Sequence, residues 1–418
     1  MGFSFSAALS GLRANSNALG VTGNNIANAN TVAYKSGSIS FADIFSSSSG
    51  VRLNGSGSSV QTGNGVRTSG TSTNFSQGGI NESGTSTHAA IEGNGFFVAR
   101  DKDGALAYTR AGDFNIDRDG YLTTPNGFRV QGYTAVNGQI PAGSIPDSLR
   151  IPLGDTIAPV TTSEATLRMN LNSSDPAGDV FHAPVQVYDS RGVARTLDLV
   201  MTKQADGSYL LNATLDGVAA NASIDGGAAS NAPVAVTFDA NGRLATPNTL
   251  SIVPDQTQLG GATLPSIALN LRQPGTNAPN LTNYASPSTV SSTAQDGFAS
   301  GTLTGLVFGD RSGTLSAVFS NGQRYQLGQL ALATFNAPSG LSHVGNNLYV
   351  ETPGSGQPSV GQPDSGGRGG VLGGALEQSN VDIASEFTDL IVAQRGFQAN
   401  SRVITTINQT LQDLLQIV

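Results

Sequence analysis

The stretch "DLIVAQRGFQANSRVITTINQTLQDLLQIV" (389–418) carries apolar residues up to the last position of the chain. Counting back from Val418 in steps of seven gives a line of apolar residues: Leu411, Ile404, Phe397, Leu390 and Ile383. A second line, interleaved at spacings of four and three, contains Phe387, Gln394, Ser401, Asn408 and Leu415. This heptad pattern predicts a long helix that begins near Asn380 or Asp382 and pairs with another helix as a coiled coil.

The N-terminal stretch repeats this arrangement. Apolar residues seven apart form one line, Phe5, Leu12, Leu19 and Ile26, and the interleaved positions are Leu9, Ser16 and Gly23. A helix cannot bury such a stripe against itself, so we expect the two terminal helices to pair within one molecule. The C-terminal stripe is wider than one partner needs, because it also includes Ile391, Val403, Ile407 and Leu414. Surplus apolar surface on a helix pair predicts self-assembly, with the polar line setting the register.

Composition narrows the classes of partner. The chain has 418 residues, of which only 12% are charged, and a formal net charge of -8. A basic patch for nucleic acid is therefore not expected. The chain has no cysteine, which excludes disulfides and thiolate chemistry. No apolar run is long enough to span a bilayer, and the N-terminus lacks the features of a secretory signal peptide, so we expect a chain that is soluble or that leaves the cytosol by a route that reads no cleavable signal.

The central part of the chain predicts β-structure. Asp103-Gly104 and Asp119-Gly120 lie between apolar runs, which is a strong hairpin signal. We expect a multidomain α+β fold with nested topology, in which a terminal helical pair accompanies two mainly antiparallel, sandwich- or barrel-like β domains. The expected parts are a helical domain (1–30 with 380–418), an extended low-complexity linker (31–88), a core β domain (89–155 with 291–379) and an inserted outer β domain (156–290).

Residues with catalytic or metal-binding potential form no recognisable pattern. His88, His182 and His343 share no metal-ligand spacing. The two Asp-x-Asp-Gly segments at 101–104 and 117–120 lack the further ligands of a calcium loop and are expected to be hairpin turns. We expect no cofactor, no metal and no enzymatic activity, although a secreted β-rich adhesin or enzyme stays an alternative. Removal of residues 383–418 would separate these classes, because only an assembly subunit would stop polymerising.

Both ends of the chain resemble a known family. The segments "SGLRANSNALGVTGNNIANANTVAYKS" (10–36) and "GALEQSNVDIASEFTDLIVAQRGFQANSRVITTINQTLQDLLQI" (374–417) are similar to the terminal signatures of the rod and hook subunits of bacterial flagella. "YTRAGDFNIDRDGYLTTPNGFRVQGY" (108–133) resembles the core β domain of this family. The residues that carry the terminal motifs are Asn24, Asn25, Asn28, Thr31, Tyr34, Lys35, Ser379, Asn380, Val381, Asp382, Gln394, Arg395 and Asn400.

The resemblance implies a structural subunit that polymerises into a flagellar tube. The length of the chain and its β insert favour the hook branch, a flexible universal joint that transmits torque from rod to filament, while a distal rod subunit stays an alternative. The implied partners are further copies of the chain, rod subunits, the hook cap, hook–filament junction proteins and the flagellar type III export apparatus. Two departures stand out: Ala33 replaces a usual Gly, and Gly396-Phe397 replaces a common Ala-Tyr, which would loosen the C-terminal helix by about 1 kcal/mol.

Overall fold

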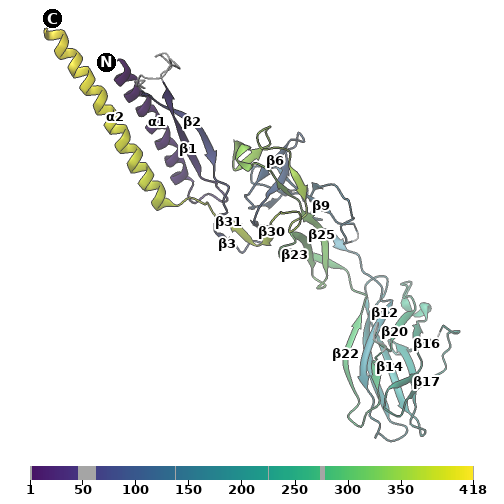
Figure 1. Ribbon diagram of the computed structural model, residues 1–418. Coiled ribbons are helices and arrows are strands. Elements are labelled where there is room, and N and C mark those ends of the chain that lie inside the picture. Colours follow the sequence, from purple (N-terminus) through teal and green to yellow (C-terminus); the bar gives the residue numbers. More distant parts are fainter. Residues whose placement is uncertain (1, 46–62, 137, 225, 274–277, 418) are drawn as a thin grey trace, which may run out of the picture. The chain divides into compact units, whose positions relative to one another are not determined.

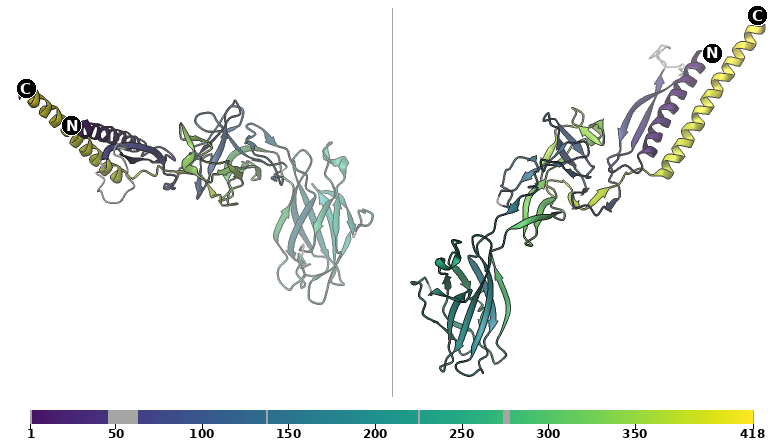
Figure 2. Two further views of the ribbon diagram at one scale, coloured as in Figure 1. Left: turned by 45° about the horizontal axis from the view of Figure 1, so that its top comes forward. Right: turned by 180° about the vertical axis from the view of Figure 1, so that it is seen from behind.

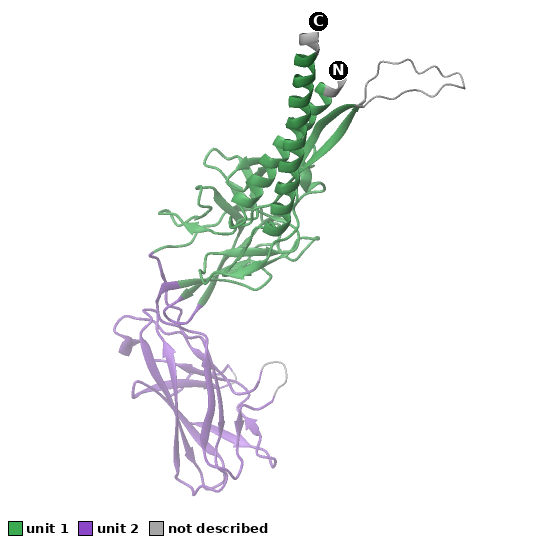
Figure 3. Ribbon diagram, turned by 90° about the vertical axis from the view of Figure 1, so that its left-hand side faces the viewer, with its two compact units in different colours: residues 1–153, 305–318, 324–418 green, residues 154–304, 319–323 purple. Residues whose placement is uncertain are grey.

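The chain forms two compact units. The computed structural model describes residues 2–45, 63–136, 138–224, 226–273 and 278–417. Unit 1 comprises residues 1–153, 305–318 and 324–418, and unit 2 comprises residues 154–304 and 319–323 (Figure 3). The chain is thus mostly β-structure, with one helix near each terminus.

The two long helices of unit 1 are α1 (Gly2–Ala27) and α2 (Ile383–Ile417). They lie side by side and antiparallel, so that both chain termini are at the same end of the pair (Figures 1 and 2). Asp382 caps α2, because its carboxylate accepts hydrogen bonds from the amides of Ala384 and Ser385 at 2.9 and 3.3 Å. Neither helix, within its described residues, is long and apolar enough to cross a membrane.

A β-hairpin covers α1. Strands β1 (Gly37–Phe45) and β2 (Gly63–Thr73) are antiparallel, with Gly37 opposite Thr73. The amide of Val66 on β2 donates to Ser10 Oγ on α1 at 3.1 Å, and Asn17 Nδ2 donates to Thr68 Oγ1 at 3.2 Å.

These two strands correct the expectation of an extended linker over 31–88. The error has a physical reason: β2 contains one large apolar residue, Val66, and it is held by hydrogen bonds to β1 and to α1 rather than by a core of its own. Residues 46–62, also part of that prediction, lie outside the described residues.

The β part of unit 1 is built around one curved sheet. Its strands follow the order β24, β25, β9, β5, β6, β28, β27. Their bounds are Thr314–Phe319, Arg324–Leu330, Arg129–Thr134, Phe96–Arg100, Leu106–Thr109, Leu348–Val350 and Ser342–Gly345. Aromatic rings fill the core in edge-to-face contacts, for example Tyr108 with Phe335 at a centroid distance of 4.8 Å.

Shorter elements complete unit 1. They are β3 (Ile80–Glu82) paired with β31 (Ala375–Glu377), β4 (Ala89–Glu92) paired with β30 (Gly370–Gly373), β7 (Asn115–Ile116), β8 (Leu122–Thr123), β10 (Asp147–Ser148), β26 (Leu332–Thr334), β29 (Ser359–Gly361) and the 3-10 helix η2 (Pro338–Gly340). The two predicted hairpin turns are confirmed: Gly104 lies between β5 and β6, Gly120 lies between β7 and β8, and both have positive φ.

Unit 2 is a curled sheet around a single apolar core. The main path runs β13, β14, β15, β16, β19, β20, β12, β21, with β22 on β12 and β17 between β15 and β18. The strands are β11 (Thr156–Ile157), β12 (Glu164–Asn170), β13 (Val180–Tyr188), β14 (Ala194–Lys203), β15 (Tyr209–Leu215), β16 (Val218–Ile224), β17 (Val234–Phe238), β18 (Leu244–Thr246), β19 (Leu250–Val253), β20 (Ile267–Asn270), β21 (Leu281–Thr282) and β22 (Thr289–Gln295), with the 3-10 helix η1 (Gln256–Leu259). Strand β23 (Gly301–Phe308) continues from unit 2 into unit 1.

Most strand pairs of unit 2 are antiparallel, whereas β12 is parallel to β20 and β21. Alternate residues of β12, β13, β14 and β15 are buried, and in β14 they include Leu197, Leu199 and Met201. This alternation produces one continuous core from strands that are far apart in the chain.

Candidate functional site

A buried ion cluster joins three segments of unit 1. Lys35 follows α1, Glu377 precedes α2, and their side chains, both fully buried, are 2.6 Å apart between Nζ and Oε1. Lys35 Nζ also donates to the carbonyl of Ser76 at 2.7 Å, and the amide of Gly78 donates to the same carboxylate oxygen at 2.9 Å. The cluster therefore ties the ends of both terminal segments to the strand region beside them.

Arg110 connects this cluster to the β core. Its Nε lies 3.2 Å from Glu377 Oε2, an ion pair without hydrogen-bond geometry, and its guanidinium donates to the carbonyls of Gly95 and Gly93 at 2.9 and 2.8 Å. Burial lowers the pKa of Lys35 and of Arg110, and the Glu377 carboxylate opposes both shifts. One carboxylate thus offsets two desolvated cations, so the loss of Glu377 would leave both without a counter-charge.

Two asparagines satisfy the backbone where the chain leaves α1 and enters α2. Asn25, only 2% exposed, donates through Nδ2 to the Gly37 carbonyl at 2.8 Å and to Glu386 Oε1 at 2.9 Å. Its Oδ1 accepts from the Gly37 amide at 2.9 Å and from the Tyr34 hydroxyl at 3.2 Å. Because Glu386 is on α2, this one side chain links α1, β1 and α2.

Asn380 plays a similar part on the other side of the junction. Its Oδ1 accepts from the Ser36 amide at 2.8 Å, while Nδ2 donates to the carbonyls of Asn74 and Ser76 at 2.8 and 3.1 Å. Polar side chains that bond to several segments in this way hold those segments in one arrangement.

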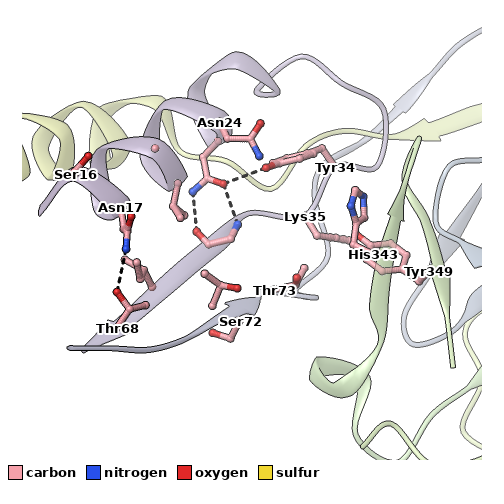
Figure 4. A pocket seen from close by; sticks show the side chains of 16 residues that line it. Ser16, Asn17, Asn24, Tyr34, Lys35, Thr68, Ser72, Thr73, His343 and Tyr349 are labelled. Carbon is pink, nitrogen blue, oxygen red and sulfur yellow. Dashed lines mark hydrogen bonds between the residues drawn. The ribbon is translucent and has the colours of Figure 1, made fainter. Parts of the chain in front are cut away.

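A pocket of about 550 Å³ opens beside the junction (Figure 4). It is lined mainly by hydroxyl and amide side chains of α1 and the β1–β2 hairpin, together with Tyr349 and His343. Lys35 also lines it, but its ammonium group is already bonded to Glu377. Within the described part of the chain, no group of three or more His, Cys, Asp or Glu side chains could hold a metal ion.

The structure brings many of the family-motif residues together. Asn25, Tyr34, Lys35 and Asn380 meet at the junction. Asn28 donates to Asn24, and Thr31 donates to Asn28, which shapes the turn after α1. Ser379 accepts from the amide of Val381, and Asp382 is the cap of α2. Gln394 and Arg395 are exposed on α2, and Asn400 is half-buried beside α1.

Sequence reasoning did not single out Glu377 or Arg110. A signal existed in the composition: the chain has only three lysines, so a lysine in a motif that ends a helix is unusual enough to require a partner. The partner itself lies 342 positions away and has no spacing rule. Ala33, the departure near Lys35, is buried and has a φ of 55°, a left-handed conformation that favours glycine.

The predicted lines on α2 need one correction. Among residues 383–413, its less exposed residues are Glu386, Leu390, Ala393, Gly396, Phe397, Asn400, Ser401, Ile404 and Ile407. The line of Leu390, Phe397 and Ile404 is therefore sheltered, but the second sheltered line begins at Glu386 rather than at Phe387. Phe387, Gln394 and Asn408 are exposed and Ser401 is half-buried, because the helices meet through small residues such as Ala393 that an apolar pattern does not select.

Several large apolar side chains of α2 stay exposed. Ile383, Phe387, Ile391, Val392, Val403 and Leu411 are between 41% and 63% exposed. On α1, Phe5 is 39% exposed, whereas Leu9, Leu12, Leu19 and Ile26 are half-buried. Leu415 belongs to α2, and Val418 lies outside the described residues. Exposed apolar surface on this scale is typical of a helix that binds further partners.

Comparison with known proteins assigns the class from the two ends of the chain. Residues 5–35 match the family described as "Flagella basal body rod protein", and residues 372–417 match "Flagellar basal body rod FlgEFG protein C-terminal". These matches cover α1, α2 and the junction motifs. They define the class of structural subunits that form the rod and hook of the bacterial flagellum.

The central matches and the relatives specify the family. Residues 90–163 match "Flagellar hook protein FlgE/F/G D1 domain", and residues 153–298 match "Flagellar basal body protein FlaE D2 domain". The chain is 34% identical to the flagellar hook protein FlgE of Borreliella burgdorferi, over 98% of each chain. It is 33% identical to that of Salmonella typhimurium, over 99% of this chain and 100% of the relative. The chain belongs to the flagellar hook protein family.

A solved structure has the same fold over much of the chain. The crystal structure of Helicobacter pylori flagellar hook protein FlgE2 is similar to 70% of this chain and 98% of that chain, with a TM-score of 0.51 and 17% sequence identity. At this identity the likeness concerns the fold alone.

Proposed function

We propose that this chain builds the flagellar hook by burying the exposed apolar side chains of α2 against neighbouring copies. As a member of the flagellar hook protein family, the chain is a structural protein of the flagellum and not an enzyme. The observation that carries the proposal is the row Ile383, Phe387 and Ile391, spaced by four and each about half exposed beside an already formed helix pair. Burial of such a row between copies would stabilise a homopolymer by about 25 cal/mol for each Å² of apolar surface removed from water.

The terminal helices form the assembly core in this proposal. α1 and α2 pair as a coiled coil, and the side chains that hold the pair and its neighbours are Phe5, Leu9, Leu12, Leu19, Ile26, Ile383, Phe387, Leu390, Phe397, Ile404, Leu411, Leu415 and Val418. The antiparallel helices and the 4-3 spacing of sheltered residues on α2 support this arrangement.

The β parts have a different task in the polymer. The domains are nested in sequence: the two ends of the chain form the helical domain, the segments next to them form the core β domain, and the insert 156–290 interrupts the core β domain. Unit 2 has its own apolar core, so it stays folded while its outer contacts form and break. Weak outer contacts around a strong helical core would let the tube bend as it transmits torque.

The wider partners follow from the family. In the flagellum, the chain would contact rod subunits, the hook cap and hook–filament junction proteins. It would leave the cytoplasm through the flagellar type III export apparatus without a cleaved signal peptide. The full-length similarity to hook proteins, which includes the insert, supports the hook over a distal rod subunit.

The test replaces Phe387 and Ile391 by Asp in the full chain. We expect polymers to disappear from electron micrographs, while the circular dichroism of the monomer stays unchanged because both side chains are exposed. The matched control is Val193→Asp in unit 2, an apolar residue of similar exposure at 49%, which should leave polymers intact. Normal polymers from the α2 variant would contradict the proposal, and so would equal loss in both variants.

A further inference from the structure

The two helices contain the same short element. α1 has "GLRAN" (11–15) and α2 has "GFQAN" (396–400), each a glycine followed four positions later by an asparagine. In both, the asparagine side chain donates to the carbonyl of the glycine in its own helix, at 2.8 Å for Asn15 and 2.9 Å for Asn400. This hydrogen bond keeps the side-chain amide of the asparagine against the surface of its own helix.

Each asparagine lies over the glycine of the other helix. A Cβ atom on Gly11 would be 2.9 Å from Asn400 Nδ2, and a Cβ atom on Gly396 would be 2.6 Å from Asn15 Oδ1. Both distances are closer than side-chain carbons normally come to other atoms, so an alanine at either site would require the opposing asparagine side chain to move. The contacts are reciprocal, and each helix supplies one bulky residue and one gap.

These contacts share one register with the junction. The facing pairs Gly11–Asn400 and Asn15–Gly396, and the hydrogen-bonded pair Asn25–Glu386, have residue numbers with the same sum. A constant sum is the geometric requirement of two antiparallel helices without a slip. The two elements therefore extend the register of the junction along the helix pair.

A slip of one turn would be penalised in either direction. In one direction, Asn15 and Asn400 would face each other, and two amides would collide across a gap made for one. In the other, Gly11 and Gly396 would face each other and leave a void where an asparagine side chain now lies. Apolar heptads alone do not distinguish registers that differ by a whole turn, because they place similar side chains opposite each other in each.

We propose that the two Gly-x-x-x-Asn elements form a reciprocal register lock between α1 and α2, with Gly11, Asn15, Gly396 and Asn400 as positioning residues. The lock determines where the exposed residues of α2 lie relative to α1, and hence which surface a neighbouring copy meets. This last consequence rests on the proposed assembly function. Glycine and asparagine are both poor helix formers, and their tertiary fit accounts for their presence in the middle of long helices.

The test uses a chain without cysteines as its background. Ala18→Cys with Ala393→Cys introduces a pair whose numbers have the same sum as the facing pairs, so disulfide formation reports the native register. A slip of one turn moves the pair by about 5 Å and beyond bonding geometry. Two variants each exchange Gly and Asn within one helix. The α2 exchange is Gly396→Asn with Asn400→Gly, and the α1 exchange is Gly11→Asn with Asn15→Gly.

Exchange in one helix alone sets Asn against Asn and Gly against Gly, while exchange in both helices restores Asn against Gly at each position. We expect either single exchange to slow disulfide formation in the monomer by about tenfold or more. The double exchange, with the same total composition, should return to within about threefold of the parent. Because rescue is measured, a single exchange that fails to fold does not spoil the test.

Two outcomes overturn the lock: single exchanges that cross-link as fast as the parent, or a double exchange no better than the single ones. Polymer formation is scored separately by electron microscopy. Rescue of cross-linking without rescue of polymers would uphold the lock and contradict its role in assembly. Polymers formed by the single exchanges despite lost cross-linking would likewise show that assembly does not depend on the register.

Discussion

Removal of the Glu377 charge is the perturbation for which the structure predicts the largest local effect. The substitution Glu377→Gln keeps the size of the side chain but leaves the ammonium of Lys35 and the guanidinium of Arg110 without their carboxylate. The side chains of Lys35 and Glu377 are both fully buried, so water cannot replace the lost carboxylate. Breaking a buried ion pair at one partner costs about 3–5 kcal/mol, and we expect Glu377→Gln to destabilise unit 1 by an amount in this range.

Lys35→Met should cost less, because Glu377 keeps Arg110 and the amide of Gly78. The double variant should be more stable than the sum of the two single losses predicts, with a coupling of about 1–3 kcal/mol. Urea unfolding of the full chain, followed by hydrogen–deuterium exchange of peptides that cover residues 33–37 and 374–380, measures both the loss and its location.

The matched control is Glu92→Gln, which removes one of the two carboxylates that pair with Arg311 in the same unit. Glu92 and Arg311 are 2.9 Å apart and about half exposed, so the control should cost less than about 1 kcal/mol. Equal effects of Glu377→Gln and Glu92→Gln, or additive losses in the Lys35 and Glu377 variants, would refute the view that a buried charge cluster fastens the junction.

Three further predictions concern other parts of the molecule. Burial first, and then the nearby carboxylates Asp389 and Asp382, raise the pKa of Glu386, with a hydrogen bond from Asn25 opposing the shift. The native state therefore binds this proton more tightly than the unfolded chain does, and the stability it adds at low pH is lost as the pH rises from 4.5 through the raised folded pKa. Glu386→Gln should flatten that dependence in unfolding curves recorded between about pH 4 and pH 7, and an unchanged slope would assign it to another group. Ala33→Gly should raise the stability of unit 1 by about 1 kcal/mol in urea unfolding, because Ala33 has a left-handed φ of 55°; a loss would mean that its buried methyl group matters more. Leu171→Ala, at a fully buried position of unit 2, should cost about 2–5 kcal/mol and leave hydrogen exchange in α1 and α2 unchanged, whereas faster exchange in the helices would show that the units unfold together.

Local patterns were sufficient to predict the two helices and the two Asp-Gly hairpin turns. The 4-3 spacing of apolar residues predicts α2, and its start near Asp382 agrees with the cap found there. Asp-Gly pairs predict the turns at Gly104 and Gly120 because glycine adopts the positive φ that those turns need. The terminal motifs also identify the family, since each is long and lies at its expected end of the chain.

Local patterns did not predict the features that depend on contacts between distant segments. Strand β2 contains so few apolar residues that it resembles a linker, and its partners β1 and α1 are what hold it. The apolar pattern predicts that the second sheltered line of α2 begins at Phe387, whereas in the structure it begins at Glu386, which accepts a hydrogen bond from Asn25. An apolar pattern identifies hydrophobic contacts and passes over a carboxylate that packs against another helix.

By itself, the sequence determined the two terminal helices, the hairpin turns at Gly104 and Gly120 and the family to which the chain belongs, because these depend on spacings within a few turns. Only the tertiary structure decided the register of α1 against α2 and the union of Lys35, Arg110 and Glu377. The physical reason is that such contacts join residues hundreds of positions apart, and they depend on gaps and single charges that leave no periodic trace in the chain.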